Sequence, residues 1–408
     1  MERLYDKLKA YSESDFYAFH MPGHKRNKTL LGIELPYDLD ITEIDGFDDL
    51  HHADGILKEE QERAARVFGA EESHFLVNGS TAGILSAVMG CTHRGDKILV
   101  ARHCHKSIYH AIYMNGLVPR YVYPEFDISM HMNGEISKED VAKALAAEPD
   151  IKAVVIVSPN YDGVVSDVKG IAEVAHSYRI PLIVDEAHGP HFGFHPAFPG
   201  RANDLGADVV INSLHKTLPS LTQTAILHIN GKLANRRRIK KYLDMLQSSS
   251  PSYIFMASLD ACVDFLDGKC EEAFELYVER LQKFREELKP LQHLQILRTE
   301  HYDISKVVIS TANANITSPE LADRLRKEYH LEMEMTGGTY VLAMTTVADT
   351  QEGLNRLKAA LLEIDDQLEA KTAVSGSIEI SGELPRLEQY FTPVSYTHLR
   401  AHETRRHL

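Results

Sequence analysis

Short apolar runs rich in β-branched residues alternate with helix-patterned stretches between about residues 72 and 230, and this alternation constrains the fold more than any other feature. Repeated units of one strand and one helix predict a mainly parallel sheet covered by helices on both faces. The predicted strands are 74–77, 97–101, 119–123, 153–157, 182–184, 208–212 and 224–229, and the predicted helices are 56–68, 81–89, 107–115, 138–147 and 168–178. The sequence therefore predicts an α/β fold whose sites gather at the carboxyl ends of the strands.

The pattern changes after about residue 230. Helices, including 232–246 and 271–288, dominate to about residue 290. An α+β block follows, with predicted strands 306–310, 331–335 and 340–345, helices 319–329 and 352–368, and a hairpin turn at 335–339. We predict an N-terminal arm at 1–50, a large domain at 51–290 and a small, incomplete C-terminal domain at 291–393. Residues 394–408 are basic and His-rich in an acidic chain, so we expect them to be a foreign tail and exclude them from the site.

The overall charge and the cysteines restrict the class of protein. The net charge of −15, from 44 basic and 59 acidic residues, disfavours a nucleic-acid or anionic-membrane binder. No uncharged apolar run approaches the length that a bilayer span requires. Four cysteines lack metal-type spacing and are too sparse for a disulfide framework. We therefore expect a cytoplasmic protein with reduced thiols and no nucleic-acid or membrane partner.

Two predicted strands end in residues that are capable of chemistry. Lys216 follows the strand at 208–212 within Ser-Leu-His-Lys-Thr, and Asp185 follows the strand at 182–184. A lysine at such a place either extends its amine to solvent or acts as an amine nucleophile. His188 and His191 near Asp185 also allow a metal interpretation, but no convincing third ligand follows, so we predict no metal site.

Two further strand ends supply complementary groups. Gly79 permits a tight turn before a helix that begins at Ser80 and Thr81, whose hydroxyls and N–H groups can bind a phosphate or simply cap the helix. His103 or His105, after the next strand, can lie on an aromatic ring or serve as a hydrogen-bonded structural residue. A phosphate turn, a ring histidine, an aspartate and a lysine, in this chain order, are the parts that pyridoxal phosphate (PLP) requires of a protein.

The motifs resemble those of the bacterial ornithine/lysine/arginine decarboxylase family, PLP enzymes with the aspartate-aminotransferase-like fold (PLP fold type I). The segments that carry the resemblance are Met-Pro-Gly-His-Lys (21–25), Asp-Ile-Thr-Glu (40–43), Asn-Gly-Ser-Thr (78–81), His-Cys-His-Lys-Ser (103–107), Asp-Glu-Ala-His-Gly (185–189), Ser-Leu-His-Lys-Thr (213–217) and Ser-Ser-Pro-Ser-Tyr (249–253). The match extends to about residue 393 and corresponds to the short form of the family, without a receiver-like N-terminal domain. The sequence departs from the family after Thr392 and Pro393, where family members continue into a Pro- and Gly-rich segment.

The resemblance implies a role for each site residue. Lys216 would bind the cofactor covalently, Asp185 would pair with the pyridinium nitrogen, and either His188 or Lys216 would donate the proton at the substrate Cα. The remaining cofactor contacts would be His105 stacked on the ring, Ala187 and His188 along the ring face and the substrate side, and Gly79, Ser80, Thr81, Ser213 and His215 around the phosphate.

The implied function is decarboxylation of a basic amino acid, arginine or lysine first and ornithine next, giving a polyamine-type product and CO₂ in a homodimer or higher homo-oligomer. An aminotransferase is an alternative, although no arginine is clearly placed to bind the α-carboxylate. A catalytically weak or dead PLP-binding homologue is another, because the C-terminal segment of the family is replaced. A dinucleotide-binding dehydrogenase is disfavoured, since no G-x-G-x-x-G follows the first strand.

Overall fold

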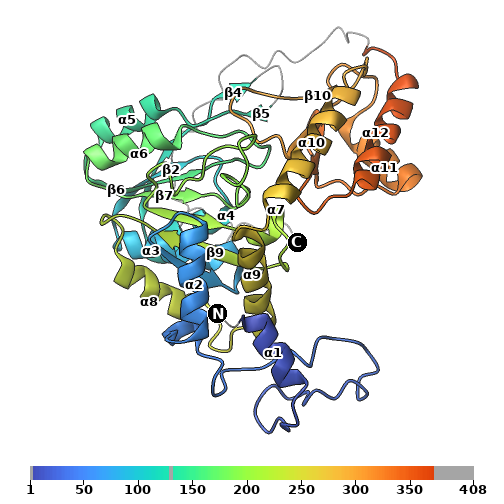
Figure 1. Ribbon diagram of the computed structural model, residues 1–408. Coiled ribbons are helices and arrows are strands. Elements are labelled where there is room, and N and C mark those ends of the chain that lie inside the picture. Colours follow the sequence, from blue (N-terminus) through green and yellow to red (C-terminus); the bar gives the residue numbers. More distant parts are fainter. Residues whose placement is uncertain (1–2, 128–131, 372–408) are drawn as a thin grey trace, which may run out of the picture.

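Two β-sheets, each flanked by helices, dominate the computed structural model of the chain (Figure 1). The structure describes residues 3–127 and 132–371. The predicted foreign tail at 394–408, and the part of the predicted small domain after residue 371, lie outside the described residues. Within the described ranges, no helix combines the length and apolar character needed to cross a bilayer.

The larger sheet has seven strands in the order β1-β9-β8-β7-β6-β2-β3. Strand β9 runs antiparallel to its neighbours β1 and β8, and the other neighbouring pairs are parallel. The mainly parallel sheet that the sequence predicts is therefore confirmed. Its strands are β1 (Glu72–Leu76), β2 (Lys97–Ala101), β3 (Val118–Val122), β6 (Ile151–Val157), β7 (Leu182–Asp185), β8 (Val209–Asn212) and β9 (Ala225–Ile229).

Helices cover both faces of this sheet. Side chains of α3 (Gly79–Cys91), α4 (Lys106–Asn115) and α8 (Arg236–Leu246) form one apolar layer with the strands. Helices α5 (Lys138–Ala147) and α6 (Val168–Ser177) cover the opposite face (Figure 1), where their side chains form a second apolar layer with the strands. Because the strands are buried on both sides, they consist of almost continuous apolar residues, as in the Ile-Lys-Ala-Val-Val-Ile-Val sequence of β6.

Helix α3 packs closely because it carries glycines at its contacts. A Cβ atom on Gly83 would lie 2.6 Å from Leu76 Cδ1 in β1, and one on Gly90 would lie 2.9 Å from the backbone nitrogen of Ile239 in α8. Any larger residue at either position would push α3 away from the sheet or from α8. The N-terminus of α3, which carries the predicted phosphate turn, is thereby fixed against the sheet.

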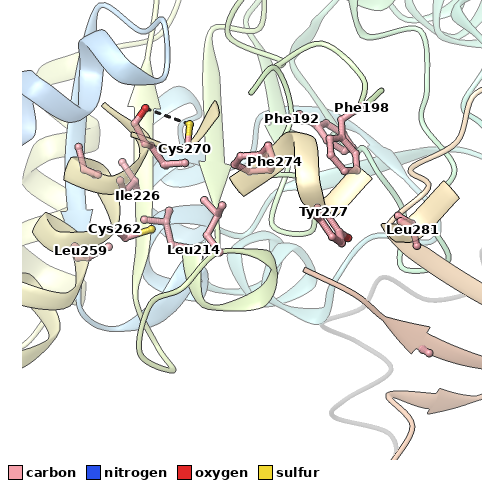
Figure 2. Packing of buried hydrophobic residues seen from close by; sticks show 14 of the residues in the cluster. Phe192, Phe198, Leu214, Ile226, Leu259, Cys262, Cys270, Phe274, Tyr277 and Leu281 are labelled. Atoms are coloured by element: carbon pink, nitrogen blue, oxygen red, sulfur yellow. Dashed lines mark hydrogen bonds between the residues drawn. The ribbon is translucent and has the colours of Figure 1, made fainter. Parts of the chain in front are cut away.

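Several helices contribute to a continuous apolar core that joins the two sheets. Helices α2 (Ile56–Val67), α9 (Tyr253–Leu266) and α10 (Glu271–Glu287), together with α1 (Leu4–Ser12), contribute buried side chains to a single cluster. Figure 2 shows Phe274 and Tyr277 of α10 in this cluster beside Phe198, and Leu214 beside the side chains of α9. The same cluster contains Val307 and Val341 of the second sheet, so one core spans both sheets.

The second sheet is antiparallel, in the order β10-β11-β13-β12. Its elements lie at the upper right of Figure 1, beside α10. They are β10 (Gln295–Ile296), β11 (Lys306–Ser310), β12 (Met335–Thr336) and β13 (Tyr340–Met344), with helices α11 (Ser318–Tyr329) and α12 (Gln351–Asp366). The shorter elements elsewhere are η1 (Leu50–His52), α7 (Leu214–Thr217), and the antiparallel pair of β4 (Phe126–Asp127) with β5 (Met132–Asn133).

Two element starts predicted from the sequence are wrong by four residues, whereas the other predicted boundaries differ from the structure by at most two. The predicted strand 331–335 is reduced to β12, because His330 adopts a left-handed conformation and the Leu331 N–H donates to Leu325 O, so these residues close α11 instead. The predicted helix 232–246 starts only at Arg236, because the side chain of Asn235 accepts a hydrogen bond from the Arg238 N–H and caps the helix there. Both errors come from caps formed by side chains or by single residues, which hydrophobic periodicity does not reveal.

Candidate active site

The predicted site residues follow strands that end at the same edge of the larger sheet. The register pairs Leu76 with Ala225, Ile226 with Asn212, Ile211 with Asp185, and Asp185 with Val157. These pairs place the carboxyl ends of β1, β8, β7 and β6 in one row, together with the start of β9. The loops that follow these strands are thus neighbours, although more than 130 residues separate Asn78 from Lys216 in the sequence.

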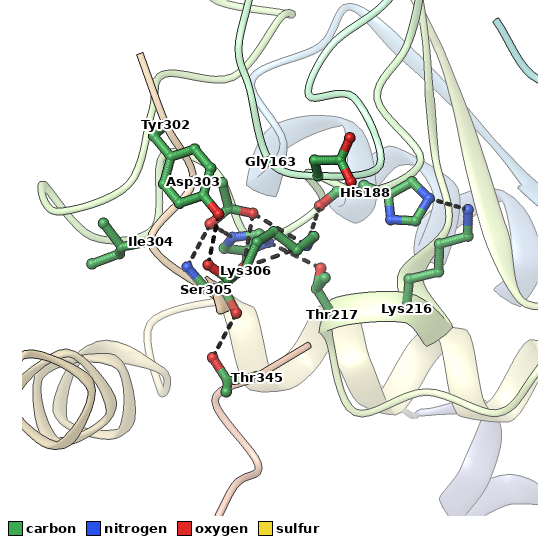
Figure 3. A network of polar contacts seen from close by, with 12 residues as sticks. Gly163, His188, Lys216, Thr217, Tyr302, Asp303, Ile304, Ser305, Lys306 and Thr345 are labelled. Carbon is green, nitrogen blue, oxygen red and sulfur yellow. Dashed lines mark hydrogen bonds and ion pairs between the residues drawn. The ribbon is translucent and has the colours of Figure 1, made fainter. Parts of the chain in front are cut away.

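Lys216 lies on α7, a single helical turn directly after β8, rather than at a bare strand end. Leu214 anchors this turn, since its side chain is fully buried in the core. The Lys216 Nζ atom lies 2.9 Å from His188 Nε2 (Figure 3). Burial lowers the pKa of Lys216, nearby Lys306 lowers it further, and Asp185 opposes both effects. The result is an amine that loses its proton more readily than an exposed lysine.

Asp185 ends β7 and is only 2% exposed. Burial raises the pKa of this carboxyl to about 6, although Lys216 and the Ala187 N–H both favour its ionised form. The Ala187 N–H donates to Asp185 Oδ1 over 3.2 Å, which places Ala187 directly against the carboxylate. A buried carboxylate of this kind is stabilised when a cation lies beside it.

His188 follows on the same loop and is also buried. Burial, Lys216 and Lys306 lower its pKa well below the ordinary value, so the imidazole is neutral at pH 7. Its Nε2 atom faces Lys216, while its buried Nδ1 atom has no hydrogen-bond partner among the described residues. A neutral imidazole in contact with an amine can exchange a proton with it.

The predicted phosphate ligands come from two helix starts. Gly79 has a φ of +72°, a conformation that suits glycine, and Ser80 and Thr81 follow in the first turn of α3. Ser213 precedes α7, and its fully buried Oγ atom has no hydrogen-bond partner in the described part of the chain. His215 uses Nδ1 to contact Thr224 O at 3.0 Å, which leaves Nε2 available for a ligand. Such unpaired polar groups next to helix N-termini suit a phosphate.

Two histidines follow β2. His105 caps α4 by accepting a hydrogen bond from the Ser107 N–H, and its Nδ1 atom lies 2.8 Å from Ser107 Oγ. Burial lowers the pKa of His105 and Lys216 lowers it further, so this ring lies within electrostatic reach of the lysine. Burial alone lowers the pKa of His103 to about 4. His105 is therefore the histidine that the fold places on the Lys216 side.

Two residues of this site escaped the sequence analysis. The Tyr161 ring lies against His188 with ring centroids 4.7 Å apart, and the Tyr161 hydroxyl donates to Glu334. Glu334 in turn raises the pKa of Lys216. Tyr161 follows β6, so the rule that located Asp185 and Lys216 could have found it. Glu334 precedes β12 in the second sheet, and no local pattern marks it.

The assembled residues fit PLP. Ser213 offers an unpaired buried hydroxyl for a phosphate, Asp185 a buried carboxylate for a cationic ring nitrogen, and Lys216 an amine of lowered pKa for an aldehyde. The family model described as "Orn/Lys/Arg decarboxylase, major domain" matches residues 3–318. The chain belongs to the Orn/Lys/Arg decarboxylase family. This confirms the family that the sequence motifs indicate.

Individual proteins resemble this family member in sequence or in fold. A Bacillus subtilis protein named arginine decarboxylase is 33% identical over 392 residues, which cover 92% of this chain and 80% of that one. The structure of the Escherichia coli constitutive lysine decarboxylase superposes with a TM-score of 0.78 at 22% identity, covering 89% of this chain and 60% of that one. An alanine–glyoxylate aminotransferase from Nostoc sp. superposes with a TM-score of 0.62 at 14% identity, covering 76% of this chain and 86% of that one. The predicted aspartate-aminotransferase-like fold, PLP fold type I, is confirmed.

Proposed function

We propose that this chain decarboxylates a basic amino acid with PLP as its cofactor, and that arginine is the preferred substrate, before lysine and ornithine. The observation that carries the proposal is the group of Lys216, His188 and Asp185 at one sheet edge, with Lys216 Nζ 2.9 Å from His188 Nε2. Membership of the Orn/Lys/Arg decarboxylase family supports the reaction. The relative named arginine decarboxylase, which aligns with 92% of this chain, supports arginine over lysine.

Each proposed cofactor contact assigns a role to one residue at this edge of the sheet. Lys216 would hold the cofactor covalently, Asp185 would pair with its ring nitrogen, and His105 and Ala187 would lie along the ring. The phosphate would be held by Gly79, Ser80, Thr81, Ser213 and His215. Bound PLP supplies an electron sink for the electron pair that remains when the carboxyl group leaves as CO₂.

The protein groups contribute charge and proton transfer. The lowered pKa of Lys216 favours its neutral amine, which can accept a proton or attack a carbonyl carbon. His188, neutral and in contact with Lys216, can pass a proton to or from this amine, so both stay candidates for the donor at the substrate Cα. Glu334 adds a negative charge within electrostatic reach of Lys216, which suits a substrate that carries a second cationic group.

The test is CO₂ release from arginine, lysine and ornithine, each supplied separately to the PLP-loaded protein, with amino transfer to a keto acid measured in parallel. We expect CO₂ release that is fastest with arginine. Faster release from lysine would overturn the substrate order alone. Amino transfer without CO₂ would make the chain an aminotransferase, and bound PLP without either reaction would make it a catalytically dead homologue.

We further propose a cytoplasmic homodimer. The four free cysteines support a reducing compartment. The arm between α1 and η1 exposes large apolar side chains, and Phe19 is 89% exposed, which supports coverage by a second copy of the chain. Light scattering on the eluted protein should give twice the mass of one chain, and a mass of 45.9 kDa would refute the dimer.

A further inference from the structure

A buried polar network from the second sheet reaches the Lys216 and His188 pair (Figure 3). Its centre is Asp303, whose side chain is fully buried just before β11. Asp303 Oδ1 lies 3.1 Å from His191 Nε2, and Asp303 Oδ2 accepts from Lys306 Nζ at 3.2 Å and from Ser305 Oγ at 2.8 Å. Both carboxylate oxygens are therefore occupied by donors.

Lys306, the first residue of β11, is also completely buried, which is rare for a lysine. Its Nζ atom lies 3.5 Å from the backbone oxygen of His188. Its stem packs against the loop after β6, because a Cβ on Gly163 would lie 2.8 Å from Lys306 Cγ. The Asp303 N–H donates to Gly163 O over 2.8 Å. The lysine is thus confined to one position, with its charge beside the backbone of His188.

The contacts form a closed ring that includes the candidate catalytic pair. Thr217, the residue after Lys216, places its Oγ1 atom 3.0 Å from His191 Nδ1. From His191 the ring continues through Asp303 and Lys306 to the backbone of His188. The His188 side chain then returns to Lys216. Both residues of the pair are therefore held in place by the network: Lys216 through its neighbour Thr217, and His188 through its own backbone carbonyl.

The network also sets the local charge. Burial alone would raise the pKa of Asp303, but His191, Lys306 and Ser305 hold it well below the ordinary value, so Asp303 stays ionised. Lys306 lowers the pKa of Lys216 and that of His188. Among the described residues, Asp185, His188, His105 and Glu334 are further charged or titratable groups near Lys216, and Tyr161 lies against His188.

We propose that Asp303 and Lys306 are positioning residues, which hold Lys216 and His188 in contact and fix the distance of the second sheet from the site. This proposal rests on the proposed function only in taking Lys216 as the reactive amine. The proposal gives the second sheet a role in aligning Lys216 with His188, in addition to its role in packing.

The experiment compares Lys306→Met and Asp303→Asn with Asp365→Asn, a matched control in the second sheet's domain. Asp365 is buried on α12 and accepts hydrogen bonds from the backbone N–H groups of Gln292, His293 and Leu294, away from the ring. The first readout is the pH midpoint for modification of Lys216 by a small amine-reactive reagent in the cofactor-free protein, followed by peptide mass spectrometry. The second is the pH midpoint of the absorbance band of lysine-linked PLP. The third is kcat and KM for CO₂ release.

We expect Lys306→Met to raise the Lys216 midpoint, by on the order of one pH unit, because a buried cation is removed. Both ring variants should lose at least about tenfold in kcat with a smaller change in KM, since the pair loses its alignment. Asp365→Asn should lower the melting temperature and leave the midpoints and kcat within about twofold. The proposal is overturned if the ring variants behave like Asp365→Asn.

A second pair of variants covers the case in which Lys306→Met or Asp303→Asn does not fold. Thr217→Val keeps the shape of the side chain but removes the hydroxyl that contacts His191, whereas Thr217→Ser keeps the hydroxyl. We expect Thr217→Val to reduce kcat about tenfold and Thr217→Ser to keep most of the wild-type kcat. Equal effects of the two variants would refute the positioning role of the ring. A wild-type protein that releases no CO₂ would refute the proposed function, and the Lys216 modification midpoint would still test the positioning role.

Discussion

Replacing Asp185 with asparagine should stabilise the cofactor-free protein at neutral pH while weakening its complex with PLP. In the structure, burial raises the pKa of Asp185 from 3.8 to about 6. A difference of about two pKa units between the folded and unfolded states corresponds to about 3 kcal/mol of folding free energy once the carboxyl is fully ionised. Asparagine has nearly the same shape and carries no charge, so it removes this penalty.

The sign of the effect fixes the pH window. The folded state holds the proton of Asp185 more tightly than the unfolded chain does. Burial of Asp185 therefore costs no charge-related stability below about pH 3.8, and this cost grows with pH until it is complete above about pH 6. The stability advantage of Asp185→Asn should therefore be about 1.5 kcal/mol at pH 5 and about 3 kcal/mol at pH 8. With PLP bound, the order should reverse, because asparagine cannot balance a cationic ring nitrogen.

The assay is urea unfolding of the cofactor-free wild type and Asp185→Asn between pH 5 and pH 8, repeated with PLP. Asp365→Asn serves as a control of opposite sign, because Asp365 accepts three backbone hydrogen bonds that asparagine cannot all replace. If Asp185→Asn is no more stable than the wild type at pH 8, or if its advantage does not change with pH, the destabilising burial of this carboxylate is refuted.

Two further predictions concern Lys216 and the packing of α3. Lys216→Ala should abolish the absorbance band of lysine-linked PLP, and persistence of that band would assign the linkage to another lysine. Gly90→Ala should lower the free energy of unfolding by about 1–3 kcal/mol, because the added Cβ would lie 2.9 Å from the backbone of Ile239. Gly353→Ala in α12 is the control, because the nearest atom to the added Cβ would be 3.8 Å away. This variant should raise the free energy of unfolding in urea by about 0.5–1 kcal/mol. A similar loss for both variants would contradict the close contact of α3 with α8.

Local patterns in the sequence were sufficient for the larger sheet and one edge of the site. Strands such as β6 are almost entirely apolar because both faces are covered, and the abrupt change to polar residues marks Asp185 and the turn that carries Lys216. The domain boundaries and the roles of the individual site residues remain predictions. The helical turn around Lys216 was missed because four residues are too few to establish a helical period.

The groups contributed by the second sheet could not be predicted in the same way. Glu334, Asp303 and Lys306 lie near Lys216 or His188 only because the second sheet packs against the loops of the first. In the sequence, Lys306 opens an ordinary apolar strand, and a charged residue at a strand end normally indicates solvent. Its complete burial depends on Asp303 and on the backbone of distant loops, and single-sequence patterns carry no information about such contacts.

The apolar cluster that extends from Leu214 to Val307 and Val341 limits how this fold can be recombined. A chimaera that takes its second sheet from a relative would combine side chains of two different proteins in one core, because α9, α10 and strands of both sheets contribute to the same cluster. The exchangeable module is therefore the second sheet together with these helices. Leu214 lies in the same cluster and belongs to the helical turn of Lys216, so a poorly matched graft would displace the Lys216 amine without altering any residue of the candidate site.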